Sequence, residues 1–189
     1  MSARPPVREE PFSVRLGQRV QSIGSRLVVG IDPVIERFPA PLRDQDAESA
    51  LVAFSDGILS AVRDTAAAVK PQIAFFERHG WPGWRALQAV VERAASYGVP
   101  VILDAKRGDI GSTAQAYADA LLGDDPETPG PWVDALTVNP YLGGDSVAPF
   151  LERAVKGHRG LFVLSRTSNP GGGDFQSRET DGEPLYLGV

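Results

Sequence analysis

The chain of 189 residues is long enough for one sizeable domain around a single buried core. Its hydrophobic share of 42% and charged share of 23% are ordinary for a globular protein, and its net charge of −5 argues against nucleic acid or an anionic membrane as the main partner. The lack of cysteine excludes disulfides, thiolate catalysis and cysteine-ligated zinc, and only two histidines, His79 and His158, disfavour a multi-histidine metal site.

The chain has no apolar run approaching the roughly 18–20 residues that are needed to span a bilayer. Residues 1–11 are polar, contain proline and carry mixed charge, so they lack the apolar stretch of a secretory signal. We therefore expect a cytoplasmic protein that acts on neither membranes nor nucleic acid.

Short apolar runs alternate along the chain with longer amphipathic segments. The runs are continuous, which is typical of strands buried on both faces, whereas the longer segments place apolar residues at helical spacing. In chain order, we predict a strand at 27–31, a helix at 46–68, a strand at 68–76, a helix from 84 to about 98, a strand at 100–104, a helix at 112–122 with Ser112 as its N-cap, a polar loop at 123–131, a strand at 134–138, a helix at 145–155 and a strand at 161–165.

This alternation predicts the α/β class, with right-handed βαβ units around a parallel sheet. An open doubly wound sheet and a (β/α)8 barrel both satisfy the pattern, and periodicity alone does not choose between them. Polar residues gather where the predicted strands end, at Asp32, 104–109, Asn139, Thr167 and Ser168. In parallel α/β folds that edge carries the active site.

The segment from Leu103 to Thr113 holds two acidic residues and a lysine at a strand end. Asp104 and Lys106 are two residues apart, so in extended chain their side chains point to the same side. Lys70, in the second strand, can place another cation beside Asp104, and a lysine between aspartates stays protonated. Surface ion pairs are the plain alternative, but burying several charges is costly unless they pair or act chemically.

These residues resemble a known family. The stretch 104–110, DAKRGDI, matches the DxKxxDI signature of the orotidine 5′-phosphate decarboxylase group, which related phosphate-sugar enzymes share. Lys70 in VKPQ and Asp32 in GIDP fall in the expected order and strands, and the segments TVNPYLG and RTSNPGG are similar to the longer, mycobacterial-type subgroup. The five segments in this order are strongly specific, and the resemblance runs from about residue 27 to 189.

The resemblance implies a (β/α)8 TIM barrel that decarboxylates orotidine 5′-phosphate to uridine 5′-phosphate in de novo pyrimidine biosynthesis, without cofactor or metal. Lys106 is then the proton donor to C6 of the pyrimidine, Asp104 lies near the departing carboxylate, and Lys70 orients Asp104 and contacts the ribose. Asp109 and Thr113 are expected to reach the partner's site in a homodimer with shared active sites.

The resemblance also implies substrate-binding residues. Asp32 is similar to the aspartate that binds the ribose, and Ser168 to the residue that reads the pyrimidine edge, with Asn139 a further substrate-binding residue. Helix capping and loop hydrogen bonding are competing roles for Thr113 and Ser168. Loss of CO2 leaves a carbanion that the ring delocalises poorly, so fixed charges must stabilise it, and a lysine ammonium can both face the carbanion and protonate it.

Five predicted strands fall short of the eight that a barrel of about 250 residues contains. We therefore expect residues 1–189 to form a single barrel domain that is incomplete at its C-terminus. Three strands, the phosphate site and the family's phosphate-gripping arginine would be missing, and Arg166 reads as a loop arginine. The unpaired sheet edge would favour association.

Two alternatives remain open. One is a sister enzyme of the 3-keto-gulonate 6-phosphate decarboxylase or hexulose phosphate synthase type, which binds Mg²⁺ through acidic residues that include a glutamate at the second strand. Lys70 stands at the matching place, and a protonated lysine cannot ligate Mg²⁺. The other is a truncated, non-catalytic fragment that only associates with itself or a homologue.

Overall fold

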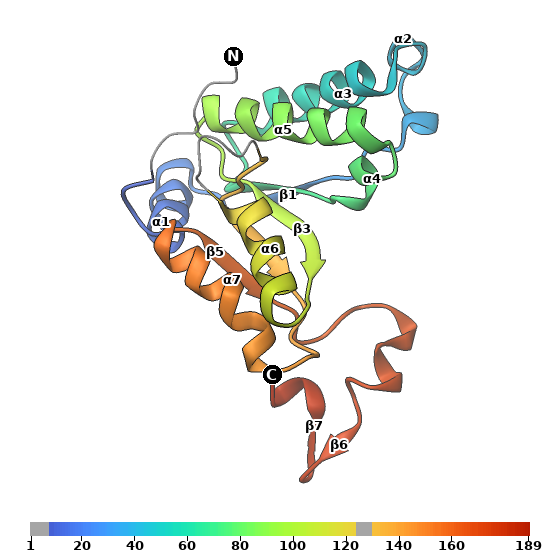
Figure 1. The fold of residues 1–189 in the computed structure, drawn as a ribbon. Coiled ribbons are helices and arrows are strands. Elements are labelled where there is room, and N and C mark those ends of the chain that lie inside the picture. The colour runs from blue at the N-terminus through green and yellow to red at the C-terminus, as the bar shows by residue number, and fades with distance from the viewer. Residues whose placement is uncertain (1–7, 124–129) are drawn as a thin grey trace.

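The computed structural model describes residues 8–123 and 130–189, and five parallel strands form the centre of this part of the chain (Figure 1). β1 pairs with β2, and β3, β4 and β5 pair in that order. Single bridges from Val69 to Val101 and from Gln72 to Asp104 join β2 to β3, so each strand neighbours the next along the chain. The strands are β1 (Val28–Ile31), β2 (Ala68–Pro71), β3 (Ile102–Arg107), β4 (Ala135–Val138) and β5 (Gly160–Val163).

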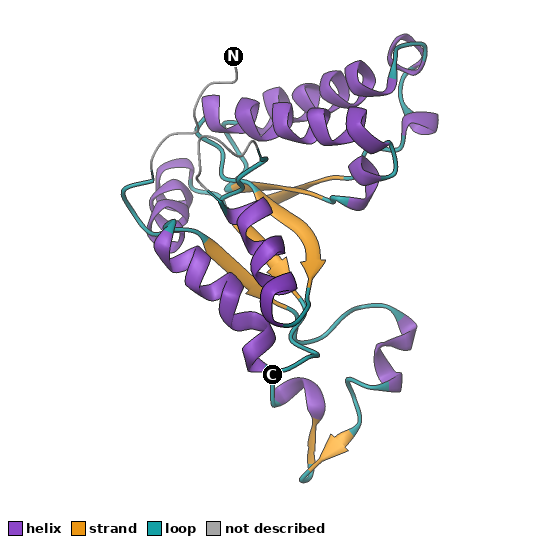
Figure 2. Ribbon diagram, viewed as in Figure 1, coloured by secondary structure: helices purple, strands orange, loops and turns teal. Residues whose placement is uncertain are grey.

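Helices lie on the outer side of the strands (Figures 1 and 2). α3 and α5 pack against each other on the side of β1, whereas α6 and α7 pack together near β4 and β5. The helices are α1 (Phe12–Ile23), α2 (Ala40–Arg43), α3 (Ala47–Val62), α4 (Ala74–Glu77), α5 (Gly80–Ser96), α6 (Gly111–Leu122) and α7 (Gly144–Lys156), and the 3-10 helices are η1 (Ile35–Arg37), η2 (Pro170–Asp174) and η3 (Leu185–Leu187).

A short antiparallel hairpin follows β5 and extends away from the helices (Figure 2). It pairs β6 (Glu179–Thr180) with β7 (Glu183–Pro184), and the turn between them contains Gly182 at a φ of 86°. The strand order of β1 to β5, with helices between successive strands, is that of the first part of a (β/α)8 barrel. The fold class predicted from the sequence is therefore confirmed, as an open partial barrel.

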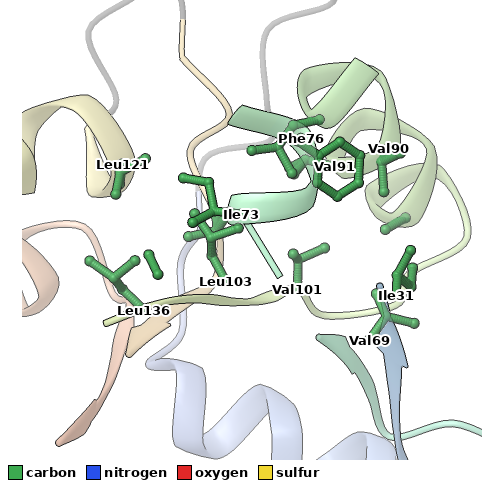
Figure 3. Close-up of a cluster of buried hydrophobic side chains, with 14 of the residues drawn as sticks. Ile31, Val69, Ile73, Phe76, Val90, Val91, Val101, Leu103, Leu121 and Leu136 are labelled. Carbon is green, nitrogen blue, oxygen red and sulfur yellow. The ribbon is translucent and has the colours of Figure 1, made fainter. Parts of the chain in front are cut away.

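Apolar side chains from the strands and from α4, α5 and α6 fill the space between the two layers (Figure 3). Phe76 of α4 is completely buried within this cluster. A Cβ atom at Gly83 of α5 would lie 1.8 Å from the carbonyl oxygen of Phe76, so only glycine allows α4 and α5 to approach this closely. The labelled members are Ile31, Val69, Ile73, Phe76, Val90, Val91, Val101, Leu103, Leu121 and Leu136.

α1 covers the N-terminal ends of the strands. Phe12 is only 6% exposed and packs with Ala68, Ile102 and Ala135, which are the first residues of β2, β3 and β4. A Cβ atom at Gly160, the first residue of β5, would lie 2.4 Å from ring atom Cδ1 of Phe12. The ring therefore closes this end of the sheet, and small residues beneath it make room for it.

A buried carboxylate fastens the N-terminal segment to the sheet. Asp134 accepts hydrogen bonds through Oδ1 from Arg8 Nε at 2.7 Å and from Arg15 at 2.8 Å, and through Oδ2 from the Val101 amide at 2.9 Å. Burial acts to raise the pKa of Asp134, but the arginines and the amide outweigh it and hold that pKa below its ordinary value of 3.8.

The predicted order of strands and helices is confirmed from residue 27 onward, but several boundaries differ. The second strand ends at Pro71, and not at 76, because the apolar run continues into the helical turn α4, in which Phe76 and the N-cap residue Ile73 are buried. The third strand runs past Asp104 to Arg107. The predicted loop at 123–131 lies mostly outside the described residues.

One helix boundary was predicted wrongly, and one helix was not predicted. Residue Ile110, and not Ser112, is the N-cap of α6, because the helix already begins at Gly111. No helix was predicted before residue 27, yet α1 is there. The signal was present in the sequence, because the apolar residues Phe12, Leu16, Val20 and Ile23 recur at helical spacing, although Phe12 is the only residue of α1 that is buried.

We expect Phe12→Ala to lower the free energy of unfolding by about 3 kcal/mol, because it removes the ring that closes four strand ends and leaves a cavity. Val14→Ala is the matched control, since Val14 lies in the same helix but is 42% exposed, and it should change stability by no more than about 0.5 kcal/mol. Urea unfolding measures both. Equal effects of the two substitutions would contradict the role given to Phe12.

Candidate active site

A carboxylate bound by two lysines lies at the C-terminal ends of β2 and β3. Lys70 Nζ is 2.8 Å from Oδ2 of Asp104, and Lys106 Nζ is 2.5 Å from Oδ1. The side chain of Asp104 is 11% exposed, whereas those of Lys70 and Lys106 are 37% and 44% exposed. Asp104 is thus the buried centre of an ion triad, and its two ammonium groups reach solvent at the strand ends.

The backbone of β3 departs from regular pairing at this triad. Leu103 pairs with Leu136 of β4, but the next pair joins Arg107 to Val138, so three residues of β3 lie opposite one residue of β4. Lys106 lies within this bulge at a φ of 48°, a left-handed conformation that costs a non-glycine residue about 1 kcal/mol. Bulges of this kind redirect side chains and are frequent next to active sites.

The charge state of Asp104 follows from its surroundings. Burial acts to raise its pKa, but the hydrogen bonds and positive charges of Lys106 and Lys70 outweigh burial and hold the pKa below the ordinary value of 3.8. The group is therefore a carboxylate at neutral pH. The spacing argument that placed Asp104 and Lys106 on one side, with Lys70 beside them, agrees with the structure.

Asp32 and Asn139 lie at the same end of the strands, directly after β1 and β4, and both are exposed. The Asn139 amide donates to the Arg107 carbonyl at 2.7 Å, which resumes the β3–β4 pairing beyond the bulge. The side-chain oxygen of Asn139 accepts a hydrogen bond from the Tyr141 amide at 3.0 Å. The substrate-binding roles of Asp32 and Asn139 remain predictions.

Three further predicted residues do not join the triad. Asp109 Oδ1 accepts from the Ile110 amide at 2.8 Å, and in the described part of the chain no hydrogen bond or ion pair links Asp109 to Lys70 or Lys106. Thr113 is exposed in the first turn of α6, and Ser168 is exposed in the loop after β5. A single chain does not test the expectation that Asp109 and Thr113 act across a dimer.

A hollow of about 230 Å³ opens between the ends of β4 and β5 and the C-terminal segment. Asn139, Thr167 and Tyr186 contribute to its lining, next to the loop that carries Ser168. Arg166 of the same loop lies with its guanidinium carbon 4.9 Å from the centre of the Tyr186 ring, as suits a loop arginine.

Thr137 is a residue of the site to which the sequence analysis gave no role. Its hydroxyl oxygen lies 3.1 Å from Oδ1 of Asp104, and the residue is 8% exposed. The available signal was a hydroxyl residue inside the otherwise apolar run 135–138.

The described residues contain neither a metal-binding cluster nor a membrane-spanning helix. Within 8–123 and 130–189, there is no group of three or more His, Asp or Glu residues that could hold a metal ion. None of the helices in these ranges is long and apolar enough to cross a membrane.

Comparison with known proteins decides the family. The model of the orotidine 5′-phosphate decarboxylase / HUMPS family matches residues 25–186. The chain belongs to the orotidine 5′-phosphate decarboxylase / HUMPS family. Within this family, the chain is 45% identical over 186 residues to the orotidine 5′-phosphate decarboxylase of Rhodopirellula baltica. The aligned region covers 94% of this chain and 62% of that protein.

Other members of the family agree. The chain is 51% identical over 166 residues to the orotidine 5′-phosphate decarboxylase of Roseiflexus castenholzii. The aligned region covers 87% of this chain and 56% of that protein. The solved structure of Leishmania donovani OMP decarboxylase superposes with a TM-score of 0.77 at 36% identity, over 95% of this chain and 63% of that one. The chain thus spans about 60% of the length of the curated relatives that it matches.

We expect the Asp104 carboxyl to titrate below pH 3.8 and its pKa to rise in Lys70→Ala, because burial then acts against one cation fewer. Since the folded-state pKa is depressed, the ion triad stabilises the fold above the unfolded pKa, and this contribution is lost as the pH falls through the folded pKa. The ¹³C chemical shift of the Asp104 carboxyl, measured against pH, gives its pKa in the unmodified chain and in Lys70→Ala. A pKa at or above 3.8 in the unmodified chain would contradict the charge state given to Asp104.

Proposed function

We propose that this chain carries the lysine–aspartate part of the active site of an orotidine 5′-phosphate decarboxylase, which converts orotidine 5′-phosphate to uridine 5′-phosphate and CO2 in pyrimidine biosynthesis. The observation that carries the proposal is Asp104 held between Lys70 and Lys106 at the strand ends. The names of the relatives from Rhodopirellula baltica and Roseiflexus castenholzii support it.

In the proposed reaction, the bond between C6 of the pyrimidine and its carboxylate breaks, and the electron pair stays on C6. The Lys106 ammonium faces the developing negative charge and then transfers its proton to C6, and solvent restores the proton to Lys106. Asp104 keeps that ammonium in a fixed place, which is the preorganisation that lowers a barrier without cost at the moment of reaction. No cofactor is needed as an electron sink.

Substrate contacts and the assembly complete the proposal. Asp32 and Lys70 bind the ribose, Ser168 reads the pyrimidine edge, and Asn139 is a further contact at the same strand ends. Asp109 and Thr113 act in the partner's site of a homodimer. Support for the last point is that Asp109 is half-buried at the start of α6 and is bonded to the Ile110 amide instead of to the lysines of its own chain.

The metal-dependent sister reaction is the competing enzyme function, and the family description, which includes HUMPS, covers both. Lys70 favours the nucleotide reaction. The Lys70 ammonium lies 2.8 Å from Oδ2 of Asp104. A Mg²⁺ ion would need that carboxylate oxygen as a ligand, and the ammonium would repel it. Decarboxylation of orotidine 5′-phosphate that persists in EDTA is expected, and activity that only Mg²⁺ restores would favour the sister reaction.

The direct test is an ultraviolet assay with orotidine 5′-phosphate, on this chain and on a protein extended to the length of its relatives. We expect Lys106→Ala to lower kcat by at least about 10²-fold, because it removes the proton donor. Lys156→Ala, an exposed lysine of α7, is the control of equal charge change and should leave kcat unaltered. Full activity of Lys106→Ala, or no turnover by either length of protein, would overturn the proposal.

A further inference from the structure

Thr137 lies where the pairing of β3 and β4 is interrupted. Its strand neighbours Leu136 and Val138 pair with Leu103 and Arg107, so Thr137 alone faces the three bulged residues 104–106. All four residues of β4 are buried, and Thr137 is the polar one among them. A hydroxyl in such a place is unfavourable unless its hydrogen bonds are made, so the partners of this one are informative.

The Thr137 hydroxyl uses its whole hydrogen-bonding capacity on the bulge. The backbone amides of Ala105 and Lys106 both donate to Oγ1, each at 2.9 Å. The hydroxyl proton has Oδ1 of Asp104 at 3.1 Å as its nearer acceptor, ahead of the Leu103 carbonyl at 3.5 Å. A hydroxyl has two lone pairs and one proton, so these three bonds saturate it.

These bonds replace the strand pairing that the bulge gives up. In a regular strand the amides of two successive residues point to opposite neighbours, so only one of Ala105 and Lys106 would face a backbone carbonyl of β4, whereas in the bulge both donate to one side chain of β4. The amide of Lys106 is thereby held while its φ stays at 48°, the conformation from which its side chain returns to Asp104. The same hydroxyl touches the carboxylate that Lys106 binds.

We propose that Thr137 is a positioning residue for the reaction, which fixes the β3 bulge and so sets the place of Lys106 relative to Asp104. Thr137 does not act on substrate itself but through these two residues. The catalytic role of Thr137 rests on the proposed decarboxylase function. The hydrogen bonds by which Thr137 holds the bulge are present in the protein without substrate.

Amide hydrogen exchange tests this geometry without any substrate. In Thr137→Val, which keeps the shape and removes the hydroxyl, the amides of Ala105 and Lys106 should exchange about tenfold faster, as expected for the loss of a hydrogen bond. The amide of Val69, which donates to the Pro100 carbonyl at 3.0 Å, reports on the rest of the sheet and should be unchanged. Unaltered exchange at Ala105 and Lys106 in the valine variant would overturn the proposal.

Thr137→Ser is the matched rescue, because it keeps the hydroxyl and loses only a methyl group. It should protect both amides as the natural residue does. Serine that leaves the two amides unprotected in a folded protein would overturn the proposal.

Kinetics separate the positioning role from the function. In protein with decarboxylase activity, Thr137→Val should lower kcat at least tenfold with KM little changed, and Thr137→Ser should restore kcat. A fall confined to KM would contradict positioning. Failure of the unmodified protein to turn over substrate would refute the decarboxylase proposal alone, because the exchange experiment still decides whether Thr137 holds the bulge.

Discussion

The carboxylate of Asp104 between two ammonium groups is the interaction on which the rest of the site depends. The buried carboxylate of Asp104 would be unfavourable without its cations, and its negative charge offsets the repulsion between the two ammonium groups that it binds. The backbone around Asp104 is fixed as well, since its carbonyl accepts from the Ile73 amide at 3.2 Å. Asp104 therefore serves both the site, through its carboxylate, and the fold, through the backbone hydrogen bond that joins β3 to the segment after β2.

The two ends of the sheet serve different purposes. At the N-terminal ends, Phe12 and the ion pairs of Asp134 close the fold, and both Phe12 and Asp134 are buried. At the C-terminal ends, the charged groups reach solvent, and the strand geometry is irregular at Lys106. This division is the usual one in parallel barrels, where one face supports stability and the other carries reactive groups.

Sequence reasoning reached the triad because its signal is local. A two-residue spacing in an extended strand places Asp104 and Lys106 on one side, and parallel strand order brings Lys70 beside them. It missed α1, although the apolar residues of that helix recur at helical spacing, and it missed the bulge opposite Thr137, which arises from the register of two strands far apart in the chain. Asp109 and Thr113 were predicted to act across a dimer and Ser168 to contact the substrate, so their contributions remain predictions, as does a single domain over residues 1–189.

The most direct test of the central claim uses the lysines themselves. The sequence contains three, Lys70, Lys106 and Lys156, so ¹⁵N labelling of lysine side chains yields one ammonium signal for each. If Asp104 holds the first two, Asp104→Asn should shift the Lys70 and Lys106 signals and speed the exchange of their protons, while Lys156 on α7 stays unchanged. Signals of Lys70 and Lys106 that do not respond to this substitution would contradict the account.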